Sequence, residues 1–186
     1  KKFYDTTNAA PQWVGQRAWI ASVCYNTVEG KKNNLPIPTD WKDLTKPVYK
    51  GHVIMPNPNS SGTGFLDVSS WLQLFGKEGG WKYMDALHEN IGRYTHSGSK
   101  PCKMAGAGET TIGISFAFRG AKLKKKGAPL DLITPTEGVG WEVEASGILK
   151  TSKKIDYLWR AVDDPEIPWV GELRSELTLE NCTPRG

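Results

Sequence analysis

The sequence predicts an α/β domain built on a mostly parallel sheet. Segments rich in β-branched and aromatic residues alternate along the chain with segments whose apolar residues recur at helical spacing. The chain has 186 residues, of which 38% are hydrophobic, so it can form one domain with a proper core. Such an alternation of strands and helices is typical of parallel sheets covered by helices.

The first expected strand covers residues 17–28 and ends near Asn26. Its run of apolar and β-branched residues is typical of a strand that crosses the centre of a sheet. Further strands are expected at residues 50–55, 111–118, 130–134 and 143–149, with a short extended stretch opening at Tyr94.

Two longer helices are expected between these strands. After Thr63 the apolar residues recur at helical spacing, which predicts one buried face made of Phe65, Val68, Leu72 and Phe75. Gly79 and Gly80 are expected to break the chain before a second helix that buries Trp81, Met84, Leu87 and Ile91.

Shorter features complete the outline. Residues 30–38 read as a loop, and Thr39 or Asp40 is expected to cap a short helix that runs to Leu44. Residues 97–99 form an expected turn, residues 103–107 one helical turn, and residues 172–180 a short amphipathic helix.

The most informative segment is the loop Met55–Gly64, which joins a short apolar strand to a helix. The first N–H groups of a helix have no partner inside it, and the helix dipole is positive there. The hydroxyls of Ser60, Ser61 and Thr63 add donors, so the loop suits phosphate, phosphonate, sulfate or carboxylate. Plain helix capping explains the same residues. The loop lacks the lysine of a P-loop, so nucleotide hydrolysis is not expected.

The composition argues against several other classes of function. The formal charge is only +4, and the lysines at 122, 124, 125 and 126 suit the solvated end of a helix. Nucleic acid is not expected as a partner, because no basic patch is interleaved with aromatic residues. No apolar run approaches the ~20 residues that span a bilayer, so no membrane insertion is expected. The first residues of the given sequence do not have the pattern expected of a signal peptide.

Cysteine and histidine usage predicts neither a metal nor a cofactor. Cys24, Cys102 and Cys182 have no metal-ligand spacing, and at most one disulfide can form among them. The three histidines are scattered along the chain, so no zinc site is suggested.

A set of ordered motifs between Arg17 and Lys150 resembles the extracytoplasmic substrate-binding proteins of ABC transporters. The likeness is to the group that includes ferric-iron binders and, more closely, 2-aminoethylphosphonate binders. The motifs are Trp41-Lys42-Asp43-Leu44, Tyr49-Lys50-Gly51, the loop Met55–Gly64, Trp71-Leu72-Gln73, Gly80-Trp81-Lys82-Tyr83-Met84, Tyr94-Thr95-His96-Ser97-Gly98-Ser99, Gly108-Glu109 and Gly113-Ile114-Ser115.

The resemblance implies a three-layer single lobe of a type II periplasmic binding protein, with helices on both sides of its sheet. Members of this group have two lobes that close on the ligand, and the likeness implies that residues 1–150 form mainly the second lobe. Residues 151–186, which are acidic and rich in proline at 163–169, read as an atypical C-terminal tail. The resemblance also implies a periplasmic location, a small anionic organic solute, and an ABC permease as partner. Two copies of the lobe facing each other would rebuild a cleft.

The resemblance implies that the site binds without catalysis. Asn59, Ser60, Ser61, Gly62, Thr63 and Gly64 would hold the phosphonate oxygens, with Ser97 and Ser99 as secondary candidates. For a ligand ammonium the residue types suggest Glu109, Glu137 or Trp141, which the resemblance does not assign.

The residues are also compatible with three alternatives. A serine-dependent hydrolase would use Ser60 or Ser61, but it needs a base within hydrogen-bond reach that the scattered histidines do not suggest. A ferric-ion binder would need adjacent tyrosines, and every tyrosine is isolated in the sequence. A lone lobe could instead serve as a protein-interaction module, which an exposed patch around Trp159 and Trp169 would favour.

Overall fold

The computed structural model describes residues 13–147. The chain divides into two compact units, one formed by Lys1–Ala18 with Val143–Gly186 and the other by Trp19–Glu142. The expected tail at 151–186, its helix at 172–180 and the residues Trp159 and Trp169 lie outside the described residues.

The described residues form six strands, four α-helices and two short 3-10 helices. In chain order they are β1 (Trp13–Asn26), α1 (Thr27–Lys32), η1 (Lys42–Thr45), η2 (Pro47–Tyr49), β2 (Val53–Pro56), α2 (Gly62–His88), β3 (Ile91–Thr95), α3 (Lys100–Gly106), β4 (Ile112–Phe116), α4 (Ala117–Lys125), β5 (Leu130–Ile133) and β6 (Trp141–Gly147). The strands expected from the sequence are therefore present, and β1 ends at Asn26 as predicted.

The sheet is mixed rather than mostly parallel, which corrects the sequence-based expectation. Its strand order is β3-β2-β4-β1-β5, and β6 pairs with β1. β2 runs parallel to both β3 and β4, whereas β1 runs antiparallel to β4 and β5. Strand direction could not be read from hydropathy, because a strand buried on both faces has the same pattern in either direction.

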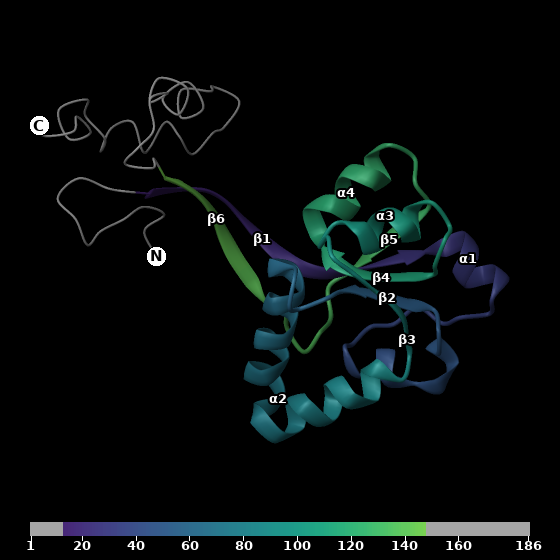
Figure 1. Ribbon diagram of the computed structural model, residues 1–186. Helices are drawn as coiled ribbons and strands as arrows, with labels where there is room; N and C mark the ends of the chain where they lie inside the picture. Colours follow the sequence, from purple (N-terminus) through teal and green to yellow (C-terminus); the bar gives the residue numbers. More distant parts are fainter. Residues whose placement is uncertain (1–12, 148–186) are drawn as a thin grey trace, which may run out of the picture. The chain divides into compact units, whose positions relative to one another are not determined.

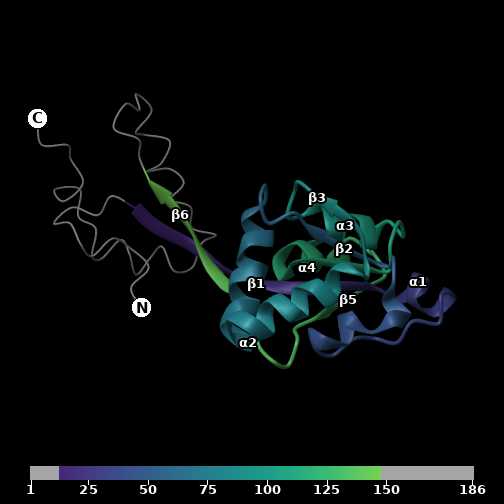
Figure 2. The same ribbon diagram turned by 60° about the horizontal axis from the view of Figure 1, so that its bottom comes forward.

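Helices cover both faces of the sheet, as the three-layer fold predicts (Figure 1). Along β1 the side chains alternate: Val23 and Tyr25 join a large core with Trp71 of α2, while Cys24 joins a smaller core with Ala105 of α3. Figure 1 shows α2 below the sheet and α3 and α4 above it, and Figure 2 brings α2 forward. The lobe is thus a helix–sheet–helix sandwich.

A disulfide joins Cys24 of β1 to Cys102 of α3, with their Cα atoms 5.4 Å apart. Both residues are fully buried in the smaller core. The bond fastens the α3 layer to an inner strand of the sheet.

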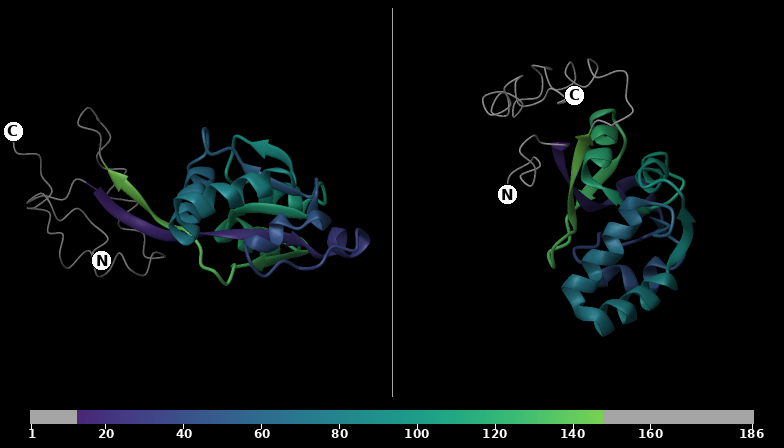
Figure 3. Two further views of the ribbon diagram at one scale, coloured as in Figure 1. Left: turned by 90° about the horizontal axis from the view of Figure 1, so that it is seen from below. Right: turned by 60° about the vertical axis from the view of Figure 1, so that its left-hand side comes forward.

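The long helix α2 bends at Gly76, not at Gly79 and Gly80 as expected. Gly76 has φ 72° and ψ 169°, a conformation that only glycine adopts without strain. Figure 1 and the right-hand view of Figure 3 show the two halves of the helix meeting at an angle. The bend lets both halves pack on the core through Trp71 and Tyr83.

The predicted buried face of these helices is partly wrong. Phe65 is 64% exposed and Trp81 is 51% exposed, while Leu87 is buried as expected. Ile91 belongs to β3 and not to the helix. The helix bends at Gly76 and not at Gly79 and Gly80, so the boundary between its two halves differs from the predicted one.

Local boundaries differ in a few places. Residues 30–32 are helical, because Asn26 caps α1 through its side chain, so the loop expected at 30–38 begins later. Neither Thr39 nor Asp40 caps η1, whose first amides are bound by Glu137. Phe118 belongs to α4, although it was expected to end the strand that the structure places at β4. The lysine run does occupy the last turn of α4, as predicted.

In the other unit, the described residues are the start of β1 and the end of β6. Arg17 Nε and Glu144 Oε2 form an ion pair 2.7 Å long between them. Among the described helices of the whole chain, none combines the length and the apolarity that a membrane span requires.

Candidate functional site

The candidate site begins where β2 ends. Asn57 folds the loop through its side chain, which accepts a hydrogen bond from the N–H of Asn59 at 2.9 Å. Ser61 is the N-cap of α2, and its hydroxyl accepts a long bond from the N–H of Gly64 at 3.4 Å. A Cβ on Gly64 would lie 2.6 Å from the Pro56 carbonyl oxygen, so glycine lets the helix start directly against the strand. The loop is therefore tightly folded onto the end of β2.

A second loop follows β3, the parallel neighbour of β2. The N–H of Asn57 donates to the carbonyl of Thr95 at 2.8 Å. This hydrogen bond joins the two loops where they leave β2 and β3. The Thr95 hydroxyl donates to the carbonyl of Ser97 at 2.9 Å, and the hydroxyls of Ser97 and Ser99 lie 3.1 Å apart. The expected turn at 97–99 is present and leads into α3.

The two loops meet at Gly98. A Cβ built on Gly98 would lie 2.7 Å from the Cβ of Thr63 and 3.1 Å from the hydroxyl oxygen of Ser61. From the adjacent strand β4, the Ser115 hydroxyl donates to the Gly98 carbonyl at 2.5 Å. Because β2, β3 and β4 are parallel, their carboxyl ends lie at the same edge of the sheet, where ligands of α/β proteins usually bind.

His96 is a member of this cluster that the sequence did not suggest. Its Nδ1 lies 3.0 Å from the hydroxyl oxygen of Ser60, and both residues are exposed. The sequence signal for His96 was its position directly before Ser97-Gly98-Ser99. A histidine by itself does not predict a binding role. No carboxylate of the described residues is bonded to His96, so the third member that orients a catalytic histidine is missing there.

The cluster presents hydrogen-bond donors to solvent. Asn59, Ser60, Gly62 and Ser97 are exposed, Ser61 and Ser99 are half-buried, and Thr63 and Gly64 are buried. The first N–H groups of α2 have no partner inside the helix. Hydroxyls and amides at the positive end of a helix suit an anion with several oxygen atoms.

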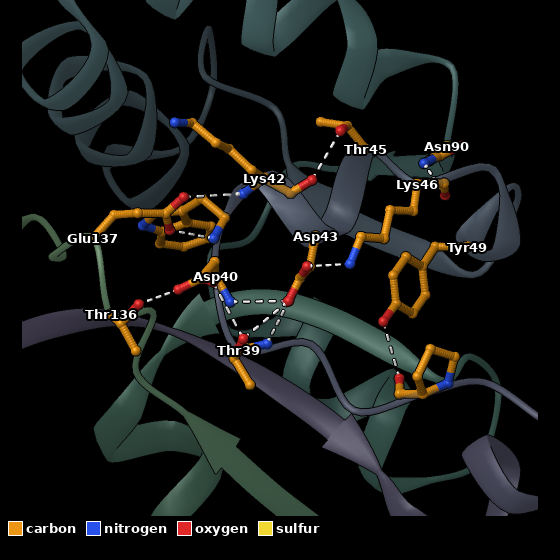
Figure 4. A network of polar contacts seen from close by, with 12 residues as sticks. Thr39, Asp40, Lys42, Asp43, Thr45, Lys46, Tyr49, Asn90, Thr136 and Glu137 are labelled. Atoms are coloured by element: carbon orange, nitrogen blue, oxygen red, sulfur yellow. Dashed lines mark hydrogen bonds and ion pairs between the residues drawn. The ribbon is translucent and has the colours of Figure 1, made fainter.

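Glu137, Trp141 and Glu109 belong to other segments of the chain than the two loops. The carboxylate of Glu137 accepts from the N–H groups of Trp41 at 2.5 Å and of Lys42 at 3.3 Å, which anchors it to η1 (Figure 4). Trp141 begins β6 and is 49% exposed. Glu109 is exposed in the turn before β4. Eight of the ten predicted residues thus lie in the two loops or in the first turn of α2, and Glu137 and Trp141 belong to other segments.

The polar network around η1 is structural. Asp43 pairs with Lys46 at 2.5 Å and accepts from the N–H of Thr39 at 2.8 Å (Figure 4). The hydrogen bond from Lys46, followed by that from the Thr39 backbone, lowers the pKa of Asp43 to about 2. The network fixes the segment that carries Trp41, whose ring is fully buried against Trp71.

The tyrosines of the described residues are poorly placed for a ferric ion. The hydroxyls of Tyr25, Tyr49 and Tyr83 donate to backbone carbonyls, and that of Tyr94 bonds to His88. Burial raises the pKa of Tyr49 to about 12, which opposes the phenolate that iron requires. Among the described residues no group of three or more His, Cys, Asp or Glu side chains is arranged to hold a metal ion.

The fold and the paired loops define a solute-binding lobe of the periplasmic binding protein kind. A family model described as bacterial extracellular solute-binding protein matches residues 2–163, and the chain belongs to this family. Two of its structural neighbours, AfuA and P5PA, are periplasmic binding proteins.

Three relatives are informative. An uncharacterized protein of Haemophilus influenzae is 40% identical over 120 residues, which are 64% of this chain and 35% of that protein. The periplasmic binding protein AfuA of Actinobacillus pleuropneumoniae, solved with fructose-6-phosphate bound, is 37% identical with a TM-score of 0.76, over 82% of this chain and 48% of AfuA. The phosphoglycerate transport regulatory protein PgtC of Salmonella typhimurium is 40% identical over 58 residues, 31% of this chain and 15% of PgtC. The chain therefore spans at most about half the length of these relatives.

Proposed function

We propose that this lobe holds the phosphate or phosphonate group of a small organic solute for an ABC importer in the periplasm. The observation that carries the proposal is the close approach of Gly98 to Thr63 and Ser61. This approach joins two donor-rich loops into one concentrated site, and charge-assisted hydrogen bonds to such an anion are the strong kind. The site residues are those of the two loops: Asn59, Ser60, Ser61, Gly62, Thr63, Gly64, Ser97 and Ser99.

The solute class rests on the chemistry of the site and on two relatives. AfuA was solved with a sugar phosphate, and PgtC is named for phosphoglycerate transport. Both compounds are phosphate monoesters, which present the same tetrahedral oxyanion as 2-aminoethylphosphonate. We therefore propose phosphate monoesters together with 2-aminoethylphosphonate-like phosphonates as the ligand class, with the organic part of the solute left to groups beyond the two loops.

A single lobe is expected to bind weakly. Losing about 4 kcal/mol of ligand contacts weakens binding about a thousandfold, and water enters a site that does not close. Two copies facing each other would restore the missing contacts. Light scattering with and without ligand tests whether two copies associate. A molecule that is monomeric in both states would contradict this hypothesis.

Calorimetric titration tests the proposal with three compounds: 2-aminoethylphosphonate, fructose-6-phosphate and inorganic phosphate. We expect binding in the range of millimolar or tighter, lost in the double variant Ser60→Ala/Ser97→Ala, whose hydroxyls are exposed. Ser69→Ala is the matched control, because that hydroxyl bonds only within α2, to the carbonyl of Phe65. Equal binding by the double variant, or no heat with any of the three compounds, would contradict the proposal.

A further inference from the structure

Positive charge is concentrated in one short part of the chain. Residues 100–128 contain seven Lys and Arg residues and one acidic residue, Glu109, a net charge of +6. The whole chain, with 24 basic and 20 acidic residues, carries only +4, so the remainder is net negative by two charges. The excess of positive charge is therefore located in residues 100–128 and is not spread over the whole chain.

The basic residues of this segment lie in or directly after α3 and α4, the helices above the sheet in Figure 1, and the strand β4 between these helices contains no charged residue. A Cβ on Gly106, at the end of α3, would lie 3.6 Å from Leu123 Cδ1 of α4, so the two helices pack together near their ends. Six lysines of this segment are exposed. We call them the basic face: Lys100, Lys103, Lys122, Lys124, Lys125 and Lys126.

The charges of the basic face are largely unneutralised. Lys124 pairs with Asp131 at 3.0 Å, and the other five lysines make no ion pair with any described residue. The helix dipole accounts for cations in the last turn of α4. It does not account for Lys100, which stands at the positive end of α3. The cluster is thus larger than helix capping requires.

We propose that the basic face docks the lobe peripherally on an anionic lipid bilayer surface, a role beyond the proposed solute binding. Clusters of lysine are attracted by anionic headgroups without penetrating the bilayer. An acidic protein surface is a weaker match, because protein interfaces are depleted of lysine and rely on clustered apolar anchors. The only large apolar residue that the described helices α3 and α4 expose is Phe118, at 48%.

The attraction is weak, reversible and sensitive to salt. Each lysine near an anionic surface strengthens partitioning about fivefold. At physiological ionic strength the screening length is about 8 Å, so the effect is confined to lysines that approach the headgroups.

Co-sedimentation of the full chain with lipid vesicles tests the proposal. One set of vesicles is pure phosphatidylcholine, and the other contains roughly 30% phosphatidylglycerol to supply negative charge. We expect binding to the anionic set alone, which decreases as salt is added. The variant Lys122→Glu/Lys125→Glu/Lys126→Glu should lose about a hundredfold or more of the partition coefficient, since three favourable charges are removed.

The matched control is Lys50→Glu/Lys77→Glu/Lys82→Glu, which makes the same change of net charge at exposed lysines outside the basic face. Circular dichroism melting verifies that both variants fold. Retained binding by the control supports the proposal. Equal loss in both variants would assign the attraction to net charge alone and overturn it. Absence of binding to anionic vesicles by the unaltered chain would also overturn it.

Discussion

Gly98 of the β3–α3 loop packs directly on Thr63 in the first turn of α2. A Cβ at position 98 would lie 2.7 Å from the Cβ of Thr63, far inside van der Waals contact. Both residues of this contact are held in place. The Ser115 hydroxyl donates to the Gly98 carbonyl, and Thr63 is buried in α2. The two loops of the site therefore meet without room for one methyl group.

Gly98→Ala is expected to separate the two loops. Because the added methyl meets the side chain of Thr63, the loop at 97–99 must shift, which costs about 1–3 kcal/mol of unfolding free energy. Affinity for a phosphate or phosphonate should fall with it, since the two sets of hydroxyls no longer converge. Urea unfolding and calorimetric titration measure the two effects.

The control for this variant is Gly62→Ala. A Cβ on Gly62 meets nothing within 4 Å, so stability should change little although the residue lies in the same site. Unchanged stability and affinity in Gly98→Ala would show that the contact between the loops is not needed.

Asp67 is a buried carboxylic acid. Within residues 13–147, neither of its carboxyl oxygens has a hydrogen-bond partner, and the same holds for the indole N–H of Trp71, one turn later on α2. Burial raises the pKa of Asp67 well above its usual value. The side chain is therefore expected to be neutral in the folded protein at pH values where it is ionised in the unfolded chain.

The sign of the resulting pH dependence follows from this shift. The folded state keeps its proton while the unfolded state loses it, so stability falls as the pH rises above about 4, until the raised folded pKa is reached. Within that window the loss is about 1.4 kcal/mol per pH unit. Asp67→Asn should remove this slope, whatever its constant effect on stability. Urea unfolding from pH 4 to 8 measures it.

The matched control for Asp67→Asn is Asp85→Asn, an exposed position on the second half of α2. It should keep the slope of the unaltered chain. Parallel pH profiles for the unaltered chain and Asp67→Asn would show that the carboxyl is ionised when folded.

The elements of the fold were largely predictable, because each strand or helix has a local signature. β1 was predicted to end at Asn26, whose amide side chain indeed caps the next helix. The antiparallel direction of β1 and the bend at Gly76 were not predictable. Both depend on packing across the sheet. Residues 76–80 contain three glycines, and no local sequence feature predicts which of them lies at the bend.

The candidate site stays a prediction, and the sequence suggests its first loop more clearly than its second. Ser60, Ser61 and Thr63 stand in a strand–loop–helix pattern that suits an anion and that helix capping also explains. His96 was missed, because its contact with Ser60 joins residues 36 positions apart. Glu137 was proposed from its charge alone, and its bonds to the amides of Trp41 and Lys42 come from a distant segment.

The disulfide between Cys24 and Cys102 should contribute strongly to stability. It closes a loop over a sequence separation of 78 residues, for which the chain-entropy model gives an upper value of about 4.5 kcal/mol. Cys24→Ala/Cys102→Ala is therefore expected to lower the unfolding free energy by about 2–4 kcal/mol. Denaturant unfolding with and without reductant measures it, and Cys182→Ser should leave the value unchanged. A reductant-independent midpoint in the unaltered chain would contradict the bond.

The affinities of two ligands can show whether Glu137 has a structural role or a ligand-binding role. Because its carboxylate accepts from the amides of Trp41, the N-cap of η1, and of Lys42, Glu137→Ala should lower the unfolding free energy by about 1.5–3 kcal/mol, the usual loss for a hydrogen bond to a charged group. A structural role predicts that any loss of affinity is the same for 2-aminoethylphosphonate and for ethylphosphonate, which lacks the ammonium. A role in holding the ammonium predicts a selective loss for the amine. Titration of both compounds into Glu137→Ala and Glu137→Gln decides between them, and we expect equal losses because both carboxylate oxygens are already bonded to backbone amides.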